Sequence, residues 1–212
     1  MCRIYIRLSV FFLLSVFLSS CQEQDCDFCD VETQEVLQIS TSYGDIYVKL
    51  FEETPLHQQN FDSLVRAGYY DSTEFHRCVD NFVIQGGSPT SKDDNRNNDG
   101  SGGPGYTIPA EIDTSIYKHH FGALAAARLG NMTNPERRSS GSQFYIVTDP
   151  DGASFLDNEY TVFGTVLAGM DVAKMIEKQP KNANGLPNER IPIIIRYVSL
   201  SPQELIDRGI VL

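Results

Sequence analysis

Apolar and polar positions alternate along several short stretches of the 212-residue chain, a pattern typical of half-buried β-strands. Residues 36–41 and 46–50 alternate on either side of a glycine-containing turn, so they predict a β-hairpin. Residues 75–79 and 82–85 are more uniformly apolar and are separated by two turn-forming residues. They predict a second hairpin whose side chains are mostly buried.

Further strands are expected in the second half of the chain, where short apolar runs lie between turns rich in glycine, proline and asparagine. The first of these runs consists largely of small residues, which would leave room for a groove beside it. The runs are 121–127, 143–148, 161–167 and 191–200.

Two segments instead repeat apolar residues at helical spacing. The first begins with Thr54 as the expected N-cap and Pro55 at the first helical position, and Gly68 ends it. The second covers residues 170–178. Many short strands with only two helices predict an all-β barrel or sandwich, and the chain is long enough for one domain with a sizeable core.

Two polar side chains, Arg77 and Gln85, interrupt the apolar hairpin. Burying a guanidinium in an apolar sheet is unfavourable unless its head reaches a cleft that offers acceptors. A guanidinium and an amide beside aromatic side chains favour a site for a neutral polar ligand, such as a peptide group. Taken alone, Arg77 could equally be a buried ion-pair partner, and His76 is expected to be a packed histidine rather than a base.

Three motifs follow one another along the chain. They are FHRCVDNFVIQGG at 75–87, GSQFYI at 141–146, and FLD followed by TVFG within 155–164. The sequence GGPGY at 102–106 lies between the first two. Together these motifs resemble the signatures of the cyclophilin family of peptidyl-prolyl isomerases, and the resemblance covers about residues 36–200.

The resemblance implies an eight-stranded antiparallel β-barrel capped by two helices, which agrees with the strand pattern. It also implies an isomerase of the EC 5.2.1.8 class that acts on X-Pro bonds of proline-containing polypeptides, as a monomer, without cofactor or metal. The alternative is a catalytically silent module that binds proline peptides in the same groove. Arg77, Gln85 and Gln143 favour the enzyme, because a pure binder needs no donor aimed at the proline nitrogen.

By the same resemblance, Arg77 and Gln85 would act at the reacting peptide bond. Arg77 is always charged and only donates hydrogen bonds, so it suits the lone pair that develops on the proline nitrogen. Gln85 and Gln143 would bind the backbone groups that flank the proline. The residues expected to bind the substrate are Phe82, Val83, Gln143, Tyr145, Ala127, Arg128, Phe155, Leu156 and Tyr160.

The groove departs from the common family pattern at five of these positions. Many members have Met at Val83, Asn at Arg128, Phe at Tyr145, Trp at Phe155 and His at Tyr160. All five residues still suit a pocket. Without the indole donor of the tryptophan, tight cyclosporin binding is not implied, and the positive head of Arg128 would favour acidic peptide segments.

The first twenty residues have the composition of a signal peptide. Arg3 and Arg7 precede an apolar stretch at 8–18, which is too short to span a membrane as a mature helix. The sequence LSSC ending at Cys21 resembles the lipobox of bacterial lipoproteins, in which this cysteine becomes the lipidated N-terminus. A plain secretory signal is the alternative.

We therefore expect four segments: a signal peptide at 1–20, an acidic flexible tether at 21–35, the isomerase domain at 36–200, and a tail at 201–212 that adds a short turn of helix. The expected location is extracytoplasmic in a bacterium, with the protein anchored to the membrane by the lipid on Cys21. Its clients there would be exported proteins.

The net charge of −11 argues against nucleic acid and anionic lipid as partners. Removing residues 1–20 removes two arginines and no acid, which leaves 15 basic against 28 acidic residues. Such a chain is unsuited to nucleic acid and to electrostatic adhesion to anionic lipid.

Two further patterns could suggest other chemistry. Cys26 and Cys29 form a CxxC in an acidic segment, which we interpret as a spacer with incidental cysteines rather than a redox or zinc site. The Asp- and Asn-rich run at 93–100 resembles a calcium loop, but the bidentate Glu is not at its position. We therefore expect a solvated turn cluster.

Overall fold

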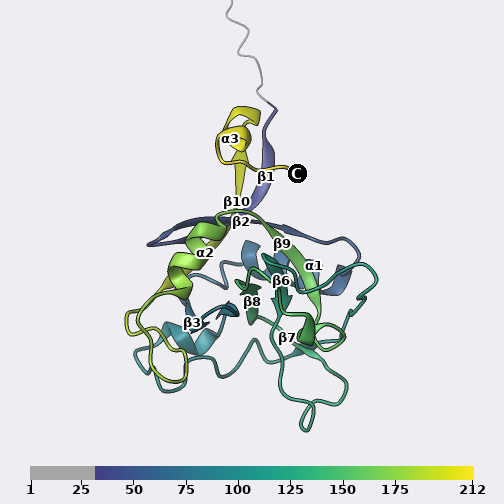
Figure 1. Ribbon diagram of the computed structural model, residues 1–212, viewed down its shortest axis with the longest axis vertical. Coiled ribbons are helices and arrows are strands. Elements are labelled where there is room, and N and C mark those ends of the chain that lie inside the picture. The colour runs from purple at the N-terminus through teal and green to yellow at the C-terminus, as the bar shows by residue number, and fades with distance from the viewer. Residues whose placement is uncertain (1–31) are drawn as a thin grey trace, which may run out of the picture. The chain divides into compact units, whose positions relative to one another are not determined.

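The computed structural model describes residues 32–212. Eight strands close into a barrel in the order β1-β10-β3-β4-β8-β6-β9-β2, and every pair of neighbours is antiparallel (Figure 1). This confirms the predicted barrel. Its strands are β1 Gln34–Thr41, β2 Gly44–Leu50, β3 Thr73–Val79, β4 Val83–Gly86, β6 Ala123–Ala126, β8 Phe144–Val147, β9 Val162–Ala168 and β10 Pro192–Leu200. Two short strands, β5 Thr107–Ile108 and β7 Ser139–Ser140, pair separately.

Helices accompany the barrel at three places in the described part of the chain. They are α1 Pro55–Arg66, α2 Met170–Glu177 and α3 Pro202–Asp207, with short 3-10 turns at η1 Pro89–Lys92 and η2 Ser154–Leu156. None of the helices between residues 32 and 212 has the length and apolar character needed to cross a membrane.

The third helix, α3, is one more than the resemblance implied. Ser201 and Glu204 form a capping box at its start, so two backbone N–H groups are satisfied reciprocally. Leu205 is 8% exposed and packs in a small cluster with Val36 and Leu200, at the ends of β1 and β10 (Figure 1). The tail after residue 200 is thus an ordered part of the described domain.

Helix α1 begins where the sequence predicted, but its N-terminus is satisfied differently. Thr54 occupies the N-cap position, yet its hydroxyl donates to the Phe51 carbonyl and makes no capping bond. The carboxylate of Glu111 instead accepts the N–H groups of Leu56 and His57, at 2.9 and 3.0 Å. A side chain far along the sequence therefore caps this helix.

Alternation in the sequence corresponds to alternation in burial. Along β10, Ile193 and Ile195 are fully buried whereas Ile194 between them is 48% exposed. The interior of the barrel is filled by such inward-facing aliphatic residues, and α1 adds Phe61 to the same core. Burying each large apolar side chain contributes about 1.5–3 kcal/mol, so this core is the main source of stability.

A β-bulge on β3 determines which face of the sheet carries Arg77. In an unbroken strand Phe75 and Arg77 would face the same side. Pairing instead shifts register between them, because Phe75 lies opposite Gly86 and Arg77 opposite Gln85. The extra residue, His76, turns Phe75 into the core, where it is fully buried, and turns Arg77 to the face that carries Gln85.

Candidate active site

The strand register places several polar and aromatic side chains in one row on the barrel surface. Arg77 on β3 pairs with Gln85 on β4, which pairs with Tyr145 on β8, and Tyr145 pairs with Ala125 on β6. Directly paired residues of antiparallel strands project to the same face. Residues of the first two motifs and of β6, which are distant in sequence, therefore meet on one surface of the sheet.

This surface forms the wall of a cavity of about 250 Å³. Two guanidiniums and an amide line it together with aromatic and aliphatic groups. The lining residues are Arg77, Phe82, Val83, Gln85, Ala127, Arg128, Tyr145, Leu156 and Tyr160.

The structure brings nine of the eleven groove residues predicted from the sequence into this lining. Phe155 lies at the rim, where it is 69% exposed and stacks on Phe82 at 5.4 Å between ring centroids. Gln143 lies behind Gln85 and is 8% exposed. The proposed lipidation residue, Cys21, falls outside the described residues.

A string of hydrogen bonds holds the guanidinium of Arg77. Its Nη1 donates to Gln85 Oε1 at 3.4 Å, and Gln85 Nε2 donates to Gln143 Oε1 at 3.0 Å. Gln143 Nε2 then donates to the carbonyls of Gly100 and Gly102, both at 2.9 Å. The amide of Gln143 is thus occupied by the protein itself, and its role here is to orient Gln85.

Arg77 forms no ion pair with any residue in 32–212. Its guanidinium carbon lies 5.9 Å from the centroid of the Phe82 ring. Since a guanidinium carries five donors and only one is engaged by Gln85, donors remain for a group in the cavity. This is the arrangement that a neutral polar ligand needs, and it differs from a buried structural ion pair.

A second polar chain lies under the cavity and was not foreseen from the sequence. The Tyr145 hydroxyl lies 2.9 Å from His119 Nε2, and His119 Nδ1 lies 2.8 Å from Asp157 Oδ1. Burial raises the pKa of Tyr145 far above its usual value and lowers the pKa of His119. Burial also acts to raise the pKa of Asp157, but its hydrogen bonds from His119 outweigh this and lower it.

One signal in the sequence could have revealed this chain. A tyrosine at a position where many family members have phenylalanine carries a buried hydroxyl that requires a partner. His119 and Asp157 were the polar residues to consider, but they lie in separate loops with no periodicity to connect them.

The cation at Arg128 is also compensated. Its Nη2 donates to Glu159 Oε2 at 2.7 Å, and its side chain is 3% exposed. The guanidinium lies over the ring of Tyr160, 4.4 Å from its centroid. Arg128 therefore supports the wall of the cavity rather than presenting a free charge to it.

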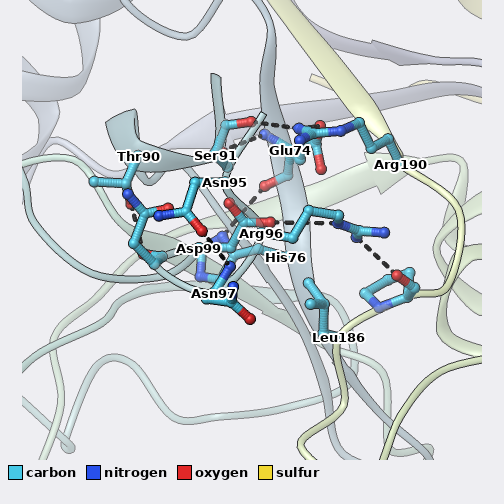
Figure 2. Close-up of polar contacts among 12 residues, drawn as sticks. Glu74, His76, Thr90, Ser91, Asn95, Arg96, Asn97, Asp99, Leu186 and Arg190 are labelled. Carbon is cyan, nitrogen blue, oxygen red and sulfur yellow. Dashed lines mark hydrogen bonds and ion pairs between the residues drawn. The ribbon is translucent and has the colours of Figure 1, made fainter. Parts of the chain in front are cut away.

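A polar network lies around His76, the residue before Arg77 on β3 (Figure 2). Arg190 Nη1 contacts Glu74 Oε1 at 2.5 Å, and Arg96 Nε lies 3.6 Å from Asp99 Oδ2. His76 is 5% exposed, and burial lowers the pKa of its ring, as expected for a packed neutral histidine. This network borders a second cavity of about 340 Å³, which shares Arg77 and Gln85 with the first.

Two side-chain oxygens of the loop that resembled a calcium site accept hydrogen bonds from its own backbone, whereas the Asp99 carboxylate is buried beside Arg96 and has no hydrogen-bond partner in the described residues. Asp93 Oδ1 accepts the N–H of Asn95, and Asn95 Oδ1 accepts the N–H of Asn97. Within residues 32–212 no three His, Cys, Asp or Glu side chains converge as a metal site. The turns at Asp93 and Asn95 are thus held by the loop's own backbone, but the expected solvation does not extend to Asp99, which is buried.

Comparison with known proteins identifies the family. The family model described as cyclophilin type peptidyl-prolyl cis-trans isomerase/CLD matches residues 36–198. The chain belongs to the cyclophilin family. A crystal structure of a cyclophilin type isomerase from Cryptosporidium parvum matches this cyclophilin with a TM-score of 0.67 and 30% identity, covering 80% of this chain and 99% of that one.

Curated relatives differ in how much of their length the chain covers. The peptidyl-prolyl cis-trans isomerase ppi1 of Schizosaccharomyces pombe is 36% identical over 164 residues, which cover 74% of this cyclophilin and 95% of that protein. The isomerase CYP71 of Arabidopsis thaliana is 38% identical over 158 residues, or 73% of this chain. The match spans only 23% of the Arabidopsis protein.

Proposed function

We propose that this cyclophilin catalyses the cis–trans isomerisation of X-Pro peptide bonds. The observation that carries the proposal is the guanidinium of Arg77, which forms no ion pair with any described residue and donates to Gln85 at the edge of a cavity with aromatic walls. The cavity combines an apolar surface for a pyrrolidine ring with free hydrogen-bond donors beside it.

The chemistry requires neither proton transfer nor a covalent intermediate. Rotation about an X-Pro bond has a barrier of roughly 20 kcal/mol because the C–N bond is partly double. A catalyst must therefore bind the twisted amide more tightly than either planar form. As the bond twists, the proline nitrogen regains a lone pair, so a donor aimed at that nitrogen stabilises mainly the transition state.

Arg77 can supply this donor. The hydrogen-bonded amides of Gln85 and Gln143 already restrict its side chain, so less conformational entropy is lost when the substrate binds. Gln85 and Gln143 fix the guanidinium before the substrate arrives, which makes the site preorganised. A thousandfold acceleration needs about 4 kcal/mol of preference for the twisted state. One removed donor in a preorganised site typically changes rates by about a hundred- to a thousandfold, so this scale is attainable.

Similarity to a solved structure supports the ligand class. A second crystal structure of the Cryptosporidium cyclophilin was determined in the presence of the dipeptide Ala-Pro. It matches this chain with a TM-score of 0.66 and 30% identity. We extend this to proline-containing polypeptides, with the proline ring among Phe82, Tyr145 and Leu156.

The test is exchange NMR of a short X-Pro peptide with wild-type protein and with Arg77→Ala. We expect catalysis in the wild type and a loss of about a hundredfold or more in kcat/KM in the variant, with the fold and weak peptide binding retained. Arg66→Ala, which removes an exposed arginine of α1, is the matched control and should retain wild-type activity. Peptide binding without acceleration in the wild type would contradict the enzyme and leave a binding module.

We also propose that the protein is a lipid-anchored, extracytoplasmic bacterial isomerase that assists the folding of exported proteins. The support comes from the sequence: a positively charged start, an apolar run at 8–18, and the small residues that precede Cys21. The acidic segment at 21–35 would separate the domain from the lipid surface.

Membrane fractionation of the full chain expressed in a bacterium tests this location. We expect the wild type in the detergent-soluble membrane fraction and Cys21→Ser in the soluble fraction, whereas a Cys26→Ser, Cys29→Ser variant should fractionate as wild type. Equal release of wild type and Cys21→Ser would favour a plain secretory signal. We propose a monomer, which light scattering of the released protein measures directly.

A further inference from the structure

Three polar side chains, Tyr145, His119 and Asp157, are hydrogen-bonded in series beneath the cavity of about 250 Å³, which we call the proline cavity. Tyr145 is 5% exposed, and the only partner of its hydroxyl among residues 32–212 is His119 Nε2, at 2.9 Å. The two rings are also stacked, with planes 12° apart and centroids 6.0 Å apart. His119 is 2% exposed, and of these three side chains only Tyr145 lines the cavity.

Asp157 determines which nitrogen of His119 carries the proton. Its Oδ1 accepts two bonds from His119, one from the backbone N–H at 2.9 Å and one from Nδ1 at 2.8 Å. A carboxylate has no proton to give, so Nδ1 must be the protonated nitrogen of the neutral ring. Nε2 is then an acceptor, and the Tyr145 hydroxyl donates to it.

We propose that His119 and Asp157 are positioning residues of the isomerase site, which fix the Tyr145 ring as the floor of the proline cavity. The proposal rests on the proposed function, since it assigns these residues a part in the same reaction. The bond to His119 holds the Tyr145 hydroxyl at one place and so restricts the orientation of its ring. A phenylalanine at this position would have no such anchor.

The chain depends on the protonation of His119. A second proton on the ring would convert Nε2 into a donor, so the Tyr145 O–H would lose its acceptor in a buried place. Several charged and titratable groups surround the two rings. Asp157 favours a proton on His119, and His120 opposes it. Lys118 acts on Asp157, and Arg128 and Tyr160 act on Tyr145. Burial keeps His119 neutral at pH 7 by lowering its pKa.

A purely structural role for the same residues makes a different prediction. The loop that carries His119 is also held by backbone groups, because Ala153 N–H donates to the His119 carbonyl at 2.7 Å and Asp157 accepts the His119 N–H. These bonds do not involve the Tyr145 hydroxyl. Tyr145→Phe therefore removes the anchor of the ring and leaves the loop contacts in place.

The experiment measures kcat/KM and peptide Kd by exchange NMR from pH 5 to pH 8 for the wild type, Tyr145→Phe, His119→Gln and His120→Gln. His120 is the exposed neighbour of His119 and provides the matched control. In the wild type we expect kcat/KM to decrease below the pKa of His119 with the slope of one proton. Tyr145→Phe and His119→Gln should be about tenfold less active at pH 7.5 and should both lose this dependence, whereas His120→Gln keeps the wild-type activity at pH 7.5 and the dependence on one proton.

Two results overturn the proposal. One is a Tyr145→Phe variant with the wild-type pH profile and with activity within about twofold of the wild type. The other is a folded His119→Gln variant whose activity and pH profile match those of the wild type. If His119→Gln does not fold, the Tyr145→Phe comparison decides. A wild type without any catalysis would contradict the proposed function itself, and the pH dependence of peptide Kd in wild type and Tyr145→Phe would then decide whether the chain positions the ring for binding.

Discussion

Arg128 and Glu159 form an ion pair in the wall of the proline cavity. Two bonds from the same guanidinium reach Glu159, one to Oε2 at 2.7 Å and one to the backbone carbonyl, also at 2.7 Å. Arg137 approaches the other carboxylate oxygen at 3.2 Å. Because the Glu159 carboxylate pairs directly with Arg128, it compensates the positive charge that the sequence predicted to favour acidic peptides, and one net positive charge remains with Arg137.

Removing this carboxylate should make the groove selective for acidic substrates. In Glu159→Gln neither Arg128 nor Arg137 keeps this carboxylate partner and the local net charge becomes more positive by one, so kcat/KM for a peptide with Glu beside the proline should rise about threefold to fivefold relative to one with Lys. The ratio for the two peptides in the wild type should be near one. Measurement at low and high salt checks the cause, since added salt screens an electrostatic effect.

Glu136→Gln is the matched control, because Glu136 is exposed and forms no ion pair with any described residue. Equal selectivity in the two variants would show that Glu159 has no special part in charge compensation at the groove.

The pairing of Arg128 illustrates what the sequence could and could not reveal. Strand and helix positions follow from local alternation, so the hairpins and the barrel were predictable. The groove was predictable only through the three motifs, because Arg77 and Tyr160 are far apart in sequence and meet through barrel closure.

Three features had no local signal. The bulge at His76 inserts one residue into a regular alternation, and alternation alone would have placed Phe75 and Arg77 on the same face. The partners of Tyr145 and Arg128 lie in loops, where neither helical nor strand periodicity applies. Pairings of this kind depend on the tertiary structure, so a single sequence does not determine them.

The cap on α1 should be a measurable part of the stability. Glu111 accepts two N–H groups of α1 and also contacts His57 Nδ1 at 2.6 Å, and His57 Nε2 reaches Ser139 at 2.8 Å. We expect Glu111→Ala to lower the free energy of unfolding by about 2 kcal/mol, because it leaves helix-end donors and a buried histidine without their acceptor. Urea unfolding measures the loss. A change below about 0.5 kcal/mol would mean that water replaces the carboxylate at no cost.

Stability should fall on mild acidification because three histidines are buried. Burial lowers the pKa of His57, His76 and His119 below the usual value of 6.5. Between the lowered pKa and 6.5 the unfolded chain binds more protons than the folded one, so the free energy of unfolding rises with pH there. Stability is therefore full above about pH 6.5 and is lost below it, by up to about 1.4 kcal/mol per pH unit for each histidine.

His76→Gln tests the origin of this slope. The Nε2 atom of His76 has no hydrogen-bond partner in the described residues. Replacing it therefore breaks no hydrogen bond at that atom. Urea unfolding at several pH values should show a slope smaller than that of the wild type by about 1 kcal/mol per pH unit. His120→Gln should leave the slope unchanged, since His120 is exposed. Parallel profiles for wild type and His76→Gln would contradict the assignment.

The C-terminal helix α3 lies beyond the segment that the family model matches, yet its packing predicts a stabilising role. Leu205 is 8% exposed, packed with Val36 and Leu200, whereas the next residue, Ile206, is 70% exposed. We expect Leu205→Ala to lower the free energy of unfolding by about 2 kcal/mol, from lost burial and a small cavity, and Ile206→Ala to change it by less than about 0.5 kcal/mol. Both variants should isomerise a short X-Pro peptide at the wild-type rate, because neither residue lines the groove. A Leu205→Ala variant as stable as Ile206→Ala would mean that α3 contributes nothing to the fold, and a loss of activity without a loss of stability would mean that α3 acts on the groove.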